Sequence, residues 1–254
     1  MDQKPYLSVV IPAYNEAERL PATLVDIDKH LRGADFSYEI LVVNDGSKDG
    51  TAEVVHKFEP MVQGLRLVDN KENKGKGKVV KQGMIEAKGQ FRLFTDADNS
   101  TSIDHFFRMI PFLEGTTEEG KFDIVIGSRD VKGSKLVPPQ PFYRRALGNI
   151  GNIVIQIFLL PKIWDTQCGF KCFSEEAAEK VFPFTRINRW AIDAEALAIA
   201  KVFGYKIKEV PITWVNDTRS RVALKAYIGT LLDVLKVRIW LWTDSYKLRE
   251  KKGK

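Results

Sequence analysis

Apolar and polar residues alternate regularly along the first half of the chain, where short β-branched runs are separated by longer amphipathic stretches. This alternation is typical of βαβ units, in which helices cover both faces of a parallel sheet. The sequence therefore predicts an α/β fold with a mostly parallel sheet flanked by helices. Strands are predicted over Leu7–Ile11, Glu39–Val43, Leu65–Val68, Phe91–Thr95 and Asp123–Ile126. Helices are predicted over Ala17–Leu31, Thr51–Phe58, Lys78–Lys88 and Ile103–Leu113.

The second half is less regular. Residues 130–141, DVKGSKLVPPQP, have neither a helical nor a strand period and predict a long surface loop of the kind that often acts as a lid. Beyond it, the short segment GFKCF at 169–173 carries no assignment from its pattern. Periodicity predicts an apolar helix at about 144–160, helices near 175–182 and 193–203, a strand near 206–212 and a C-terminal helix from about 222.

Chain length and net charge exclude few classes of protein. The 254 residues suit one large α/β domain, and 39 basic against 33 acidic residues leave a net charge of +6. That excess suits phosphate-rich ligands, an anionic membrane or nucleic acid, and does not choose among them. Cys168 and Cys172 have no Cys-rich or His-rich partner segment, so the sequence indicates reduced thiols and neither a zinc site nor a disulfide framework.

No targeting or membrane-crossing segment is expected. The start, MDQKPYLSVVIP, lacks the basic and apolar regions of a secretory signal. The longest uncharged run, Ala146–Pro161, would span about 24 Å as a helix against a hydrocarbon core of about 30 Å, and it contains Asn149, Asn152 and Gln156. We therefore expect a protein on the cytoplasmic side of the membrane.

Polar motifs follow four successive predicted strands. In open parallel sheets ligands bind beyond the carboxyl ends of the strands. Taken alone, each motif has an ordinary explanation as a helix cap, a turn or a solvated loop. Together they predict a binding site formed by residues Pro12, Ala13, Tyr14, Asn15 and Glu16, then Asp45, Gly46 and Ser47, then the run NKENKGKGK, then Asp96 and Asp98.

Asp96 and Asp98 flank Ala97 at the end of an apolar run. Two carboxylates at that spacing repel each other unless a cation lies between them, and Mg²⁺ or Mn²⁺ prefers carboxylate, water and phosphate oxygens. Such a metal would bridge to a diphosphate. Asp45 could accept hydrogen bonds from a nucleobase or ribose, and Lys74 could approach phosphate through the glycine-containing loop that follows it. These residues predict a site for a nucleoside diphosphate.

The motifs IPAYNE, VVNDGSKDGT, ENKGKGKVVKQG and DAD resemble those of family 2 glycosyltransferases of the GT-A fold. The resemblance extends over nearly the whole chain: IGSRD, FYRRALGN, WDTQCGFKCFS and RWAIDAEAL are similar to the branch that makes polyprenyl-phosphate sugars. Within it, DTQCGFK and NKGKG look more like dolichyl-phosphate glucosyltransferases, which use UDP-glucose, than dolichyl-phosphate mannose synthases, which use GDP-mannose. The resemblance implies a GT-A catalytic domain over 1–221 and a C-terminal amphipathic helix with a basic tail over 222–254.

Site residues carried over from the resemblance fall into three groups. Around the nucleotide it implies Pro12, Ala13, Tyr14, Asn15, Glu16, Asp45, Lys74, Asp96 and Ala97, with the metal on Asp98 and Asp96. Around the acceptor phosphate it implies Arg129, Arg144, Arg145, Gln167, Lys171 and Arg221, and guanidinium forks match phosphate oxygens well. The catalytic residues implied are Asp96, Asp98, Asp193 and Arg129.

Asp193 occupies the position where relatives with hydroxyl acceptors keep a base. A phosphate monoester has a second pKa of about 6 and needs little proton abstraction at neutral pH. We therefore interpret Asp193 and Glu195 as orienting or electrostatic residues on the acceptor side.

An acceptor on a polyprenyl chain stays in the bilayer, so the protein would meet it at the membrane surface. Apolar residues recur with a helical period at Leu224, Ile228, Leu231, Leu235, Ile239 and Trp242. This stripe fits either core packing or an interfacial role. Trp240, Trp242 and the basic tail KLREKKGK favour the membrane.

These observations predict an inverting, metal-dependent transfer of a sugar from UDP-glucose to a polyprenyl phosphate by a peripheral membrane protein. One alternative is transfer of mannose from GDP-mannose. Another is an aspartyl-phosphate phosphatase with Asp96 as nucleophile, although such enzymes usually carry that residue on the first strand. A third is a basic nucleotide-sugar or nucleic-acid binding protein, which the lack of aromatic-interleaved basic patches disfavours, so no nucleic acid is expected.

Overall fold

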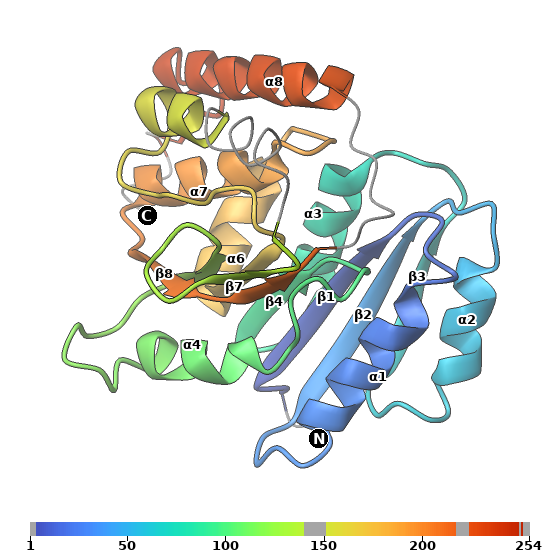
Figure 1. The fold of residues 1–254 in the computed structure, drawn as a ribbon. Coiled ribbons are helices and arrows are strands. Elements are labelled where there is room, and N and C mark those ends of the chain that lie inside the picture. The colour runs from blue at the N-terminus through green and yellow to red at the C-terminus, as the bar shows by residue number, and fades with distance from the viewer. Residues whose placement is uncertain (1–3, 140–150, 217–223, 249, 251–254) are drawn as a thin grey trace.

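The structure, a computed structural model, describes residues 4–139, 151–216, 224–248 and 250. Its centre is a seven-stranded sheet with the order β3-β2-β1-β4-β7-β5-β8, covered by helices on both faces (Figure 1). The predicted α/β fold is therefore confirmed. The strands are β1 (Leu7–Ala13), β2 (Tyr38–Asp45), β3 (Leu65–Asn70), β4 (Phe91–Thr95), β5 (Ile124–Ser128), β7 (Phe170–Ser174) and β8 (Ile207–Pro211).

The half of the sheet formed by β3, β2, β1 and β4 is entirely parallel, as expected. The other half is mixed, because β7 runs antiparallel to both of its neighbours, β4 and β5, while β5 and β8 are parallel. The segment GFKCF, which the pattern left unassigned, thus supplies a central strand. Its first four residues are all buried, so it lacks the polar alternation by which a half-exposed strand is recognised.

The helices lie near their predicted positions. They are α1 (Leu20–Leu31), α2 (Thr51–Phe58), α3 (Lys76–Glu86), α4 (His105–Glu114), α6 (Glu175–Val181), α7 (Ile192–Phe203) and α8 (Leu224–Trp242), with a short 3₁₀ helix η1 (Phe182–Phe184) and a helical stretch at 151–158. α1 begins later than predicted, at Leu20 rather than Ala17, because the preceding backbone bonds to another loop. α3 begins at Lys76, earlier than the predicted Lys78.

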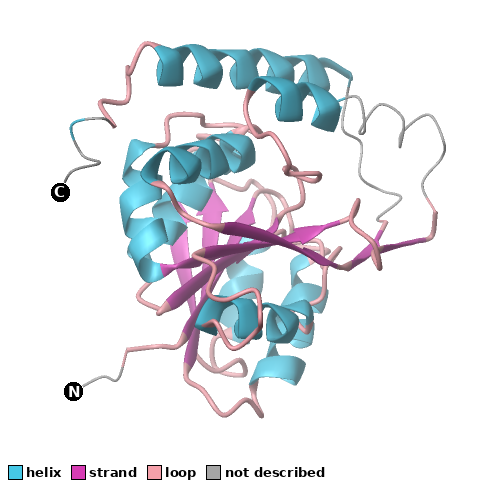
Figure 2. Ribbon diagram, turned by 90° about the vertical axis from the view of Figure 1, so that its left-hand side faces the viewer, coloured by secondary structure: helices cyan, strands magenta, loops and turns pink. Residues whose placement is uncertain are grey.

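The core consists of two apolar clusters, one on each face of the sheet, because neighbouring residues of a strand point to opposite faces. Val10 belongs to the cluster beneath α3, α6 and α7, whereas Val9 and Ile11 belong to the one beneath α1 and α4. Figure 2 shows helices packed on both sides of the strands. α8 lies at the outer end of the molecule, beside the stretch 151–158 in both views.

Residues 130–141 are not entirely loop. Residues 135–137 form a short strand, β6 (Lys135–Val137), which pairs in parallel with β9 (Thr213–Val215). The predicted strand at 206–212 corresponds to β8, and β9 follows it as a separate strand that was not predicted. A three-residue strand paired with a distant segment leaves no periodicity of its own, which explains the wrong prediction.

None of the helices described here combines the length and hydropathy that a bilayer crossing needs. The predicted Arg144, Arg145 and Arg221 lie outside the described residues, as do the start of the predicted helix at 144–160 and most of the basic tail. The predicted boundary at residue 221 also lies there and stays a prediction.

Candidate active site

The loops that follow β1 and β2 are joined by hydrogen bonds. The Asn15 amide donates to Ser47 Oγ at 2.9 Å, and the Lys48 amide donates to Asn15 Oδ1 at 2.9 Å. The Glu16 amide donates to Thr51 Oγ1 at 2.9 Å. The Asn15 and Glu16 amides, which precede α1, are thus bound by side chains of the other loop. The motifs IPAYNE and NDGSKDGT therefore form one surface at the carboxyl end of the sheet, with half-exposed Tyr14 on it.

Asp45, at the end of β2, holds the loop between β3 and α3. Its buried carboxylate accepts hydrogen bonds from the amides of Lys74, at 2.7 Å, and Gly75, at 2.9 Å. Both oxygens thus have a structural task, which sequence reasoning did not foresee. Contact of Asp45 with a nucleoside stays a prediction.

Asp96 and Asp98 follow β4, and Glu16 lies close enough to both to be affected by their charge. Burial and the neighbouring Asp96 raise the pKa of Asp98, whereas the hydrogen bond from the Ser100 amide opposes the rise. Burial also raises the pKa of Glu16, and Asp98 and Asp96 add to this effect. Arg19 pairs with Glu16 at 2.5 Å and lies 4.0 Å from Asp98 Oδ2. The site thus concentrates negative charge in a partly buried place, which favours a cationic ligand.

The lysine that faces this cluster is Lys76, and the predicted contact of Lys74 with the diphosphate stays a prediction. Lys76 Nζ lies 2.5 Å from Asp96 Oδ1 and 5.2 Å from the centre of the Trp190 ring. Burial works against its charge, but Asp96 and Asp193 outweigh burial and raise the pKa of Lys76. Lys74 is exposed and is bound to Asp45 through its backbone. Lys76 is the first residue of α3, whereas Lys74 lies in the loop before it. The sequence alone does not show where this helix begins, and so does not distinguish the two lysines.

The glycines of this loop serve a close approach within the chain. A Cβ at Gly75 would lie 2.2 Å from the carbonyl oxygen of Asn188, and one at Gly77 would lie 2.2 Å from that of Ile187. The Gly77 amide donates to Asn188 O at 2.9 Å. The glycines therefore let α3 begin against the segment that carries Trp190, whereas sequence reasoning assigned them to phosphate contact.

We expect Lys76→Met to reduce catalysis far more than Lys74→Met, because only Lys76 places its ammonium at the carboxylate cluster. A side chain that stabilises developing charge contributes about a hundredfold or more to kcat. Steady-state assays of the two variants, matched in charge and substitution, measure the difference. Equal losses would show that the lysine assignment is wrong.

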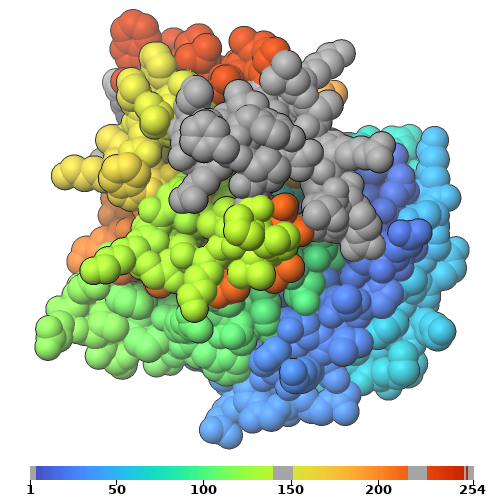
Figure 3. Space-filling model, in the orientation of Figure 1, coloured from blue at the N-terminus to red at the C-terminus, as the bar shows by residue number. Residues whose placement is uncertain are grey.

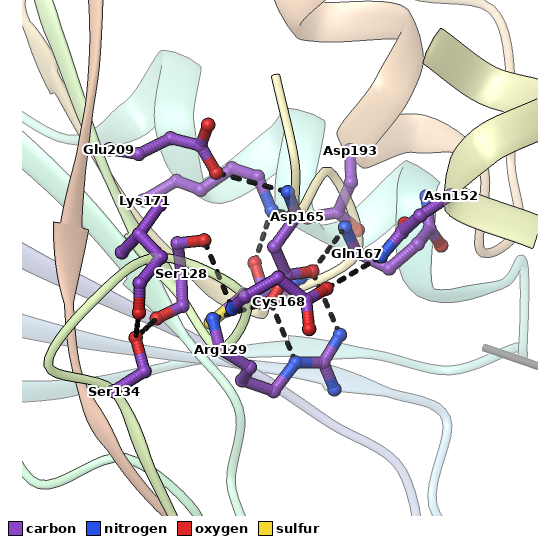
Figure 4. A network of polar contacts seen from close by, with 12 residues as sticks. Ser128, Arg129, Ser134, Asn152, Asp165, Gln167, Cys168, Lys171, Asp193 and Glu209 are labelled. Carbon is purple, nitrogen blue, oxygen red and sulfur yellow. Dashed lines mark hydrogen bonds and ion pairs between the residues drawn. The ribbon is translucent and has the colours of Figure 1, made fainter. Parts of the chain in front are cut away.

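A second polar network lies around the loop 164–169 (Figure 4). Arg129, just after β5, donates from Nε and Nη2 to the two oxygens of fully buried Asp165, at 2.7 and 2.9 Å. Asp165 also accepts from the amides of Gln167 and Cys168, and Glu209 accepts from the amides of Trp164 and Asp165. Asp165 and Glu209 were not predicted as site residues. Their partners are distant in sequence, so no local pattern could reveal them.

Arg129 thus binds an internal carboxylate. Burial opposes its charge, but Asp165 outweighs burial and raises the pKa of Arg129. Because 24% of its side-chain surface remains exposed, contact with an acceptor phosphate stays a prediction. The predicted Gln167 lies on the same loop, and its Nε2 is buried without a partner in the described part of the chain.

The loop reaches the carboxylate cluster through Gly169. A Cβ at this position would lie 2.0 Å from Asp96 Oδ2, so only glycine allows the loop to pack against the carboxylate without displacing it. The two networks therefore form one site, which extends from the β1 loop to the start of α7.

Lys171 and Asp193 are buried beneath this site as an ion pair of 2.5 Å. Because Lys171 has no exposed surface, this arrangement closes it to the direct acceptor contact that the resemblance implied. Glu195 is buried and has internal partners, and its role toward the acceptor stays a prediction. It accepts from the amides of Arg186 and Ile187 and from the Tyr246 hydroxyl at 2.6 Å, and so fixes the C-terminal segment to α7.

Comparison with known proteins decides the family. The family model "Glycosyl transferase family 2" matches residues 8–182. The chain belongs to glycosyl transferase family 2. It is 36% identical over 253 residues to the dolichyl-phosphate beta-glucosyltransferase of Dictyostelium discoideum, covering 96% of this chain and 77% of the relative. The human dolichyl-phosphate beta-glucosyltransferase is 30% identical, with 96% and 78% covered. The chain is therefore a glycosyltransferase, as predicted.

Solved structures share the fold of this family 2 member. Glucosyl-3-phosphoglycerate synthase from Mycobacterium tuberculosis, crystallised with Mn²⁺, UDP and glucosyl-3-phosphoglycerate, is 18% identical with a TM-score of 0.65, covering 92% of this chain and 80% of its own. A mannosyltransferase from Pyrobaculum calidifontis, crystallised with GDP-Man and Mn²⁺, gives 0.57 at 18% identity, with 94% and 70% covered. The GT-A fold expected for the family 2 enzyme is thus confirmed.

The carboxylates of this glycosyltransferase can supply part of a metal site. The described residues contain no group of three or more His, Cys, Asp and Glu able to hold a metal by themselves. Asp98 Oδ1 accepts a hydrogen bond from the Ser100 amide at 3.0 Å. The other oxygen, Oδ2, lies 4.0 Å from the Arg19 guanidinium. A hard divalent cation could thus take carboxylate oxygens here and complete its coordination with diphosphate and water oxygens. The donor set fits a metal that binds together with a nucleotide.

Proposed function

We propose that this glycosyltransferase moves glucose from UDP-glucose to a dolichyl or similar polyprenyl phosphate, with inversion at the sugar C1. The observation that carries the proposal is the Lys76–Asp96 contact beside Asp98, at the carboxyl end of a parallel sheet. Relatives at 30 and 36% identity over almost the whole chain, named dolichyl-phosphate beta-glucosyltransferases, support glucose as the sugar and dolichyl phosphate as the acceptor.

The chemistry required is displacement of UDP from C1 by a phosphate oxygen. Departure of UDP develops negative charge on its diphosphate, and the ammonium of Lys76 lies where it can stabilise that charge. A divalent cation held by Asp98 and Asp96 would supply further charge neutralisation. Because the acceptor phosphate is largely a dianion at neutral pH, the site needs no strong base. Asp193 accordingly acts through orientation and charge.

The acceptor's lipid chain implies contact with a membrane, and α8 offers an apolar surface for it. Five residues with the apolar spacing of α8 lie on its outer side: Ile228, Leu232, Leu235, Ile239 and Trp242 are between 40 and 78% exposed. Val234 and Val237 of α8 are fully buried instead. Ile228, Leu235, Ile239 and Trp242 of the predicted stripe thus lie outside the core, and Leu232, absent from that prediction, joins them.

A neighbouring segment extends this surface. Ile153, Ile157 and Phe158 are 51, 71 and 45% exposed, and Figure 3 shows their stretch and α8 at the same end of the molecule. Lys236 and Arg238 are exposed on α8. A large exposed apolar surface with interspersed cations fits the interface of an anionic membrane. We refer to these residues of α8 and of 151–158 as the apolar end face.

Substitution of the apolar end face is expected to release the protein from membranes. Ile239→Asp should weaken binding to vesicles with about 30% anionic lipid by roughly tenfold or more, because burying one such side chain contributes about 2 kcal/mol. Vesicle flotation measures binding. Val25→Asp is the matched control, since Val25 of α1 is 56% exposed away from this face. Equal flotation of wild type and Ile239→Asp would contradict the proposal.

A panel of labelled nucleotide sugars tests the donor and the acceptor. Purified protein is incubated with polyprenyl phosphate in vesicles, with and without EDTA, and label is followed into the lipid extract. We expect label from UDP-glucose and its loss with EDTA. Label from GDP-mannose alone would overturn the choice of donor, and the absence of labelled lipid from every sugar would overturn the proposed reaction.

A further inference from the structure

Lys171 is a charged residue in the middle of the sheet. It lies on β7, where its register partners are Phe94 on β4 and Ile126 on β5, and none of its surface is exposed. A buried ammonium persists only where partners replace its lost hydration. The groups around Nζ therefore indicate what the side chain does.

Two groups accept hydrogen bonds from Lys171 Nζ: Asp193 Oδ1 at 2.5 Å and the carbonyl oxygen of Cys168. The Phe94 ring lies 5.5 Å away. Asp193 belongs to the first turn of α7, where the helix dipole also favours a carboxylate. Lys171 thus joins three parts of the site: the central strand, the loop that ends at Gly169 and the start of α7.

The contacts continue from this pair to the open site. Lys171 bonds the carbonyl of Cys168, the next residue, Gly169, packs against Asp96, and Asp96 contacts Lys76. The exposed fraction of the side chain rises along the series, from 0% for Lys171 and 3% for Asp193 to 15% for Lys76 and 39% for Asp96. The four charges alternate in sign. One end is therefore closed and the other open to ligand.

We propose that Lys171 is a positioning residue of the transfer reaction: its bonds to Asp193 and to the Cys168 carbonyl hold the start of α7 and the loop at Gly169 against Asp96, which meets the donor diphosphate. This role takes the place of a direct contact with the acceptor phosphate. It rests on the proposed function for its donor, a nucleoside diphosphate sugar.

A double-mutant cycle tests the proposal. The dissociation constant of UDP with Mn²⁺ is measured by calorimetry for wild type, Lys171→Met, Asp193→Asn and the double variant. Each single substitution should weaken binding by about tenfold, and the double variant should be within about threefold of the weaker single, because the two residues act as one unit. Lys208→Met is the control, since Lys208 of β8 pairs with Glu119, outside the site.

Three results of this experiment would overturn the proposal. Additive losses, about a hundredfold in the double variant, would overturn the proposal. So would unchanged UDP affinity with a raised KM for polyprenyl phosphate, which marks direct contact with the acceptor. A purely structural role would lower the melting temperature of Lys171→Met without changing the UDP affinity of the folded fraction, and would also overturn it.

Lys171→Met leaves a lone buried carboxylate and can prevent folding. The double variant removes both charges, so its comparison with Asp193→Asn decides by itself: equal affinities support the proposal, and a tenfold weaker double variant refutes it. If wild type binds GDP with Mn²⁺ instead of UDP, the donor assignment fails while the same cycle with GDP decides the role of Lys171. Binding of neither nucleotide overturns both proposals.

Discussion

Asp98→Ala is expected to reduce sugar transfer by about a thousandfold without destabilising the fold. Stabilisation of leaving-group charge of this kind contributes about 3–4 kcal/mol to catalysis. Burial and Asp96 raise the pKa of Asp98, and a carboxyl whose pKa is higher in the folded than in the unfolded state opposes folding above that pKa. At neutral pH its removal should therefore leave the melting temperature unchanged or raise it.

Asp35→Asn provides the control for Asp98→Ala, because Asp35 is exposed between α1 and β2. Turnover is measured with UDP-glucose and polyprenyl phosphate at several Mn²⁺ concentrations, together with thermal melting. Wild-type turnover in Asp98→Ala would refute the assignment of the metal. A large fall in melting temperature would instead identify Asp98 as a structural residue.

Gly169→Ala should lower kcat by about a hundredfold while changing the melting temperature by only about two degrees. The added methyl would lie 2.0 Å from Asp96 Oδ2 and 2.5 Å from Asp96 Cγ, so the carboxylate must turn away and lose its contact with Lys76. Rotation of a partly exposed side chain is a small change for the fold, but a misplacement of about 1 Å in a reacting site lowers the rate by about a hundredfold.

Gly33→Ala is the matched control for this substitution, because no heavy atom outside its neighbours lies within 4 Å of the Cβ it would carry. Rate and melting temperature are compared for both variants. Normal turnover in Gly169→Ala would show that catalysis does not depend on where the Asp96 carboxylate lies.

Sequence was most informative where the determinants are local. β1 to β4 carry apolar runs bounded by turn and cap residues, so their positions and the motifs at their ends could be predicted closely. The topology of a parallel sheet then brings these ends together. For this reason the joining of the β1 and β2 loops follows from the prediction, although the individual hydrogen bonds do not.

Some site residues could not be identified from the sequence, for physical reasons. Which lysine reaches the carboxylates depends on where α3 begins, and that start depends on Gly75 and Gly77 packing against residues far along the chain. Asp165 bonds to Arg129, which follows β5, and to Glu209 on β8, both distant in sequence.

Helical spacing likewise could not decide the environment of α8. A period identifies an apolar face, but whether that face meets the core or solvent depends on what packs against it. In this fold Val234 and Val237 make the core contact, and Ile239 and Trp242 remain exposed.

A crystal structure with UDP and Mn²⁺, with the metal located by its anomalous scattering, tests most directly whether the carboxylate cluster is the catalytic centre. We predict the Mn²⁺ on Asp98, bridging to the diphosphate, with the Lys76 ammonium beside it. Metal and nucleotide bound elsewhere, with Asp96 and Asp98 untouched, would contradict it.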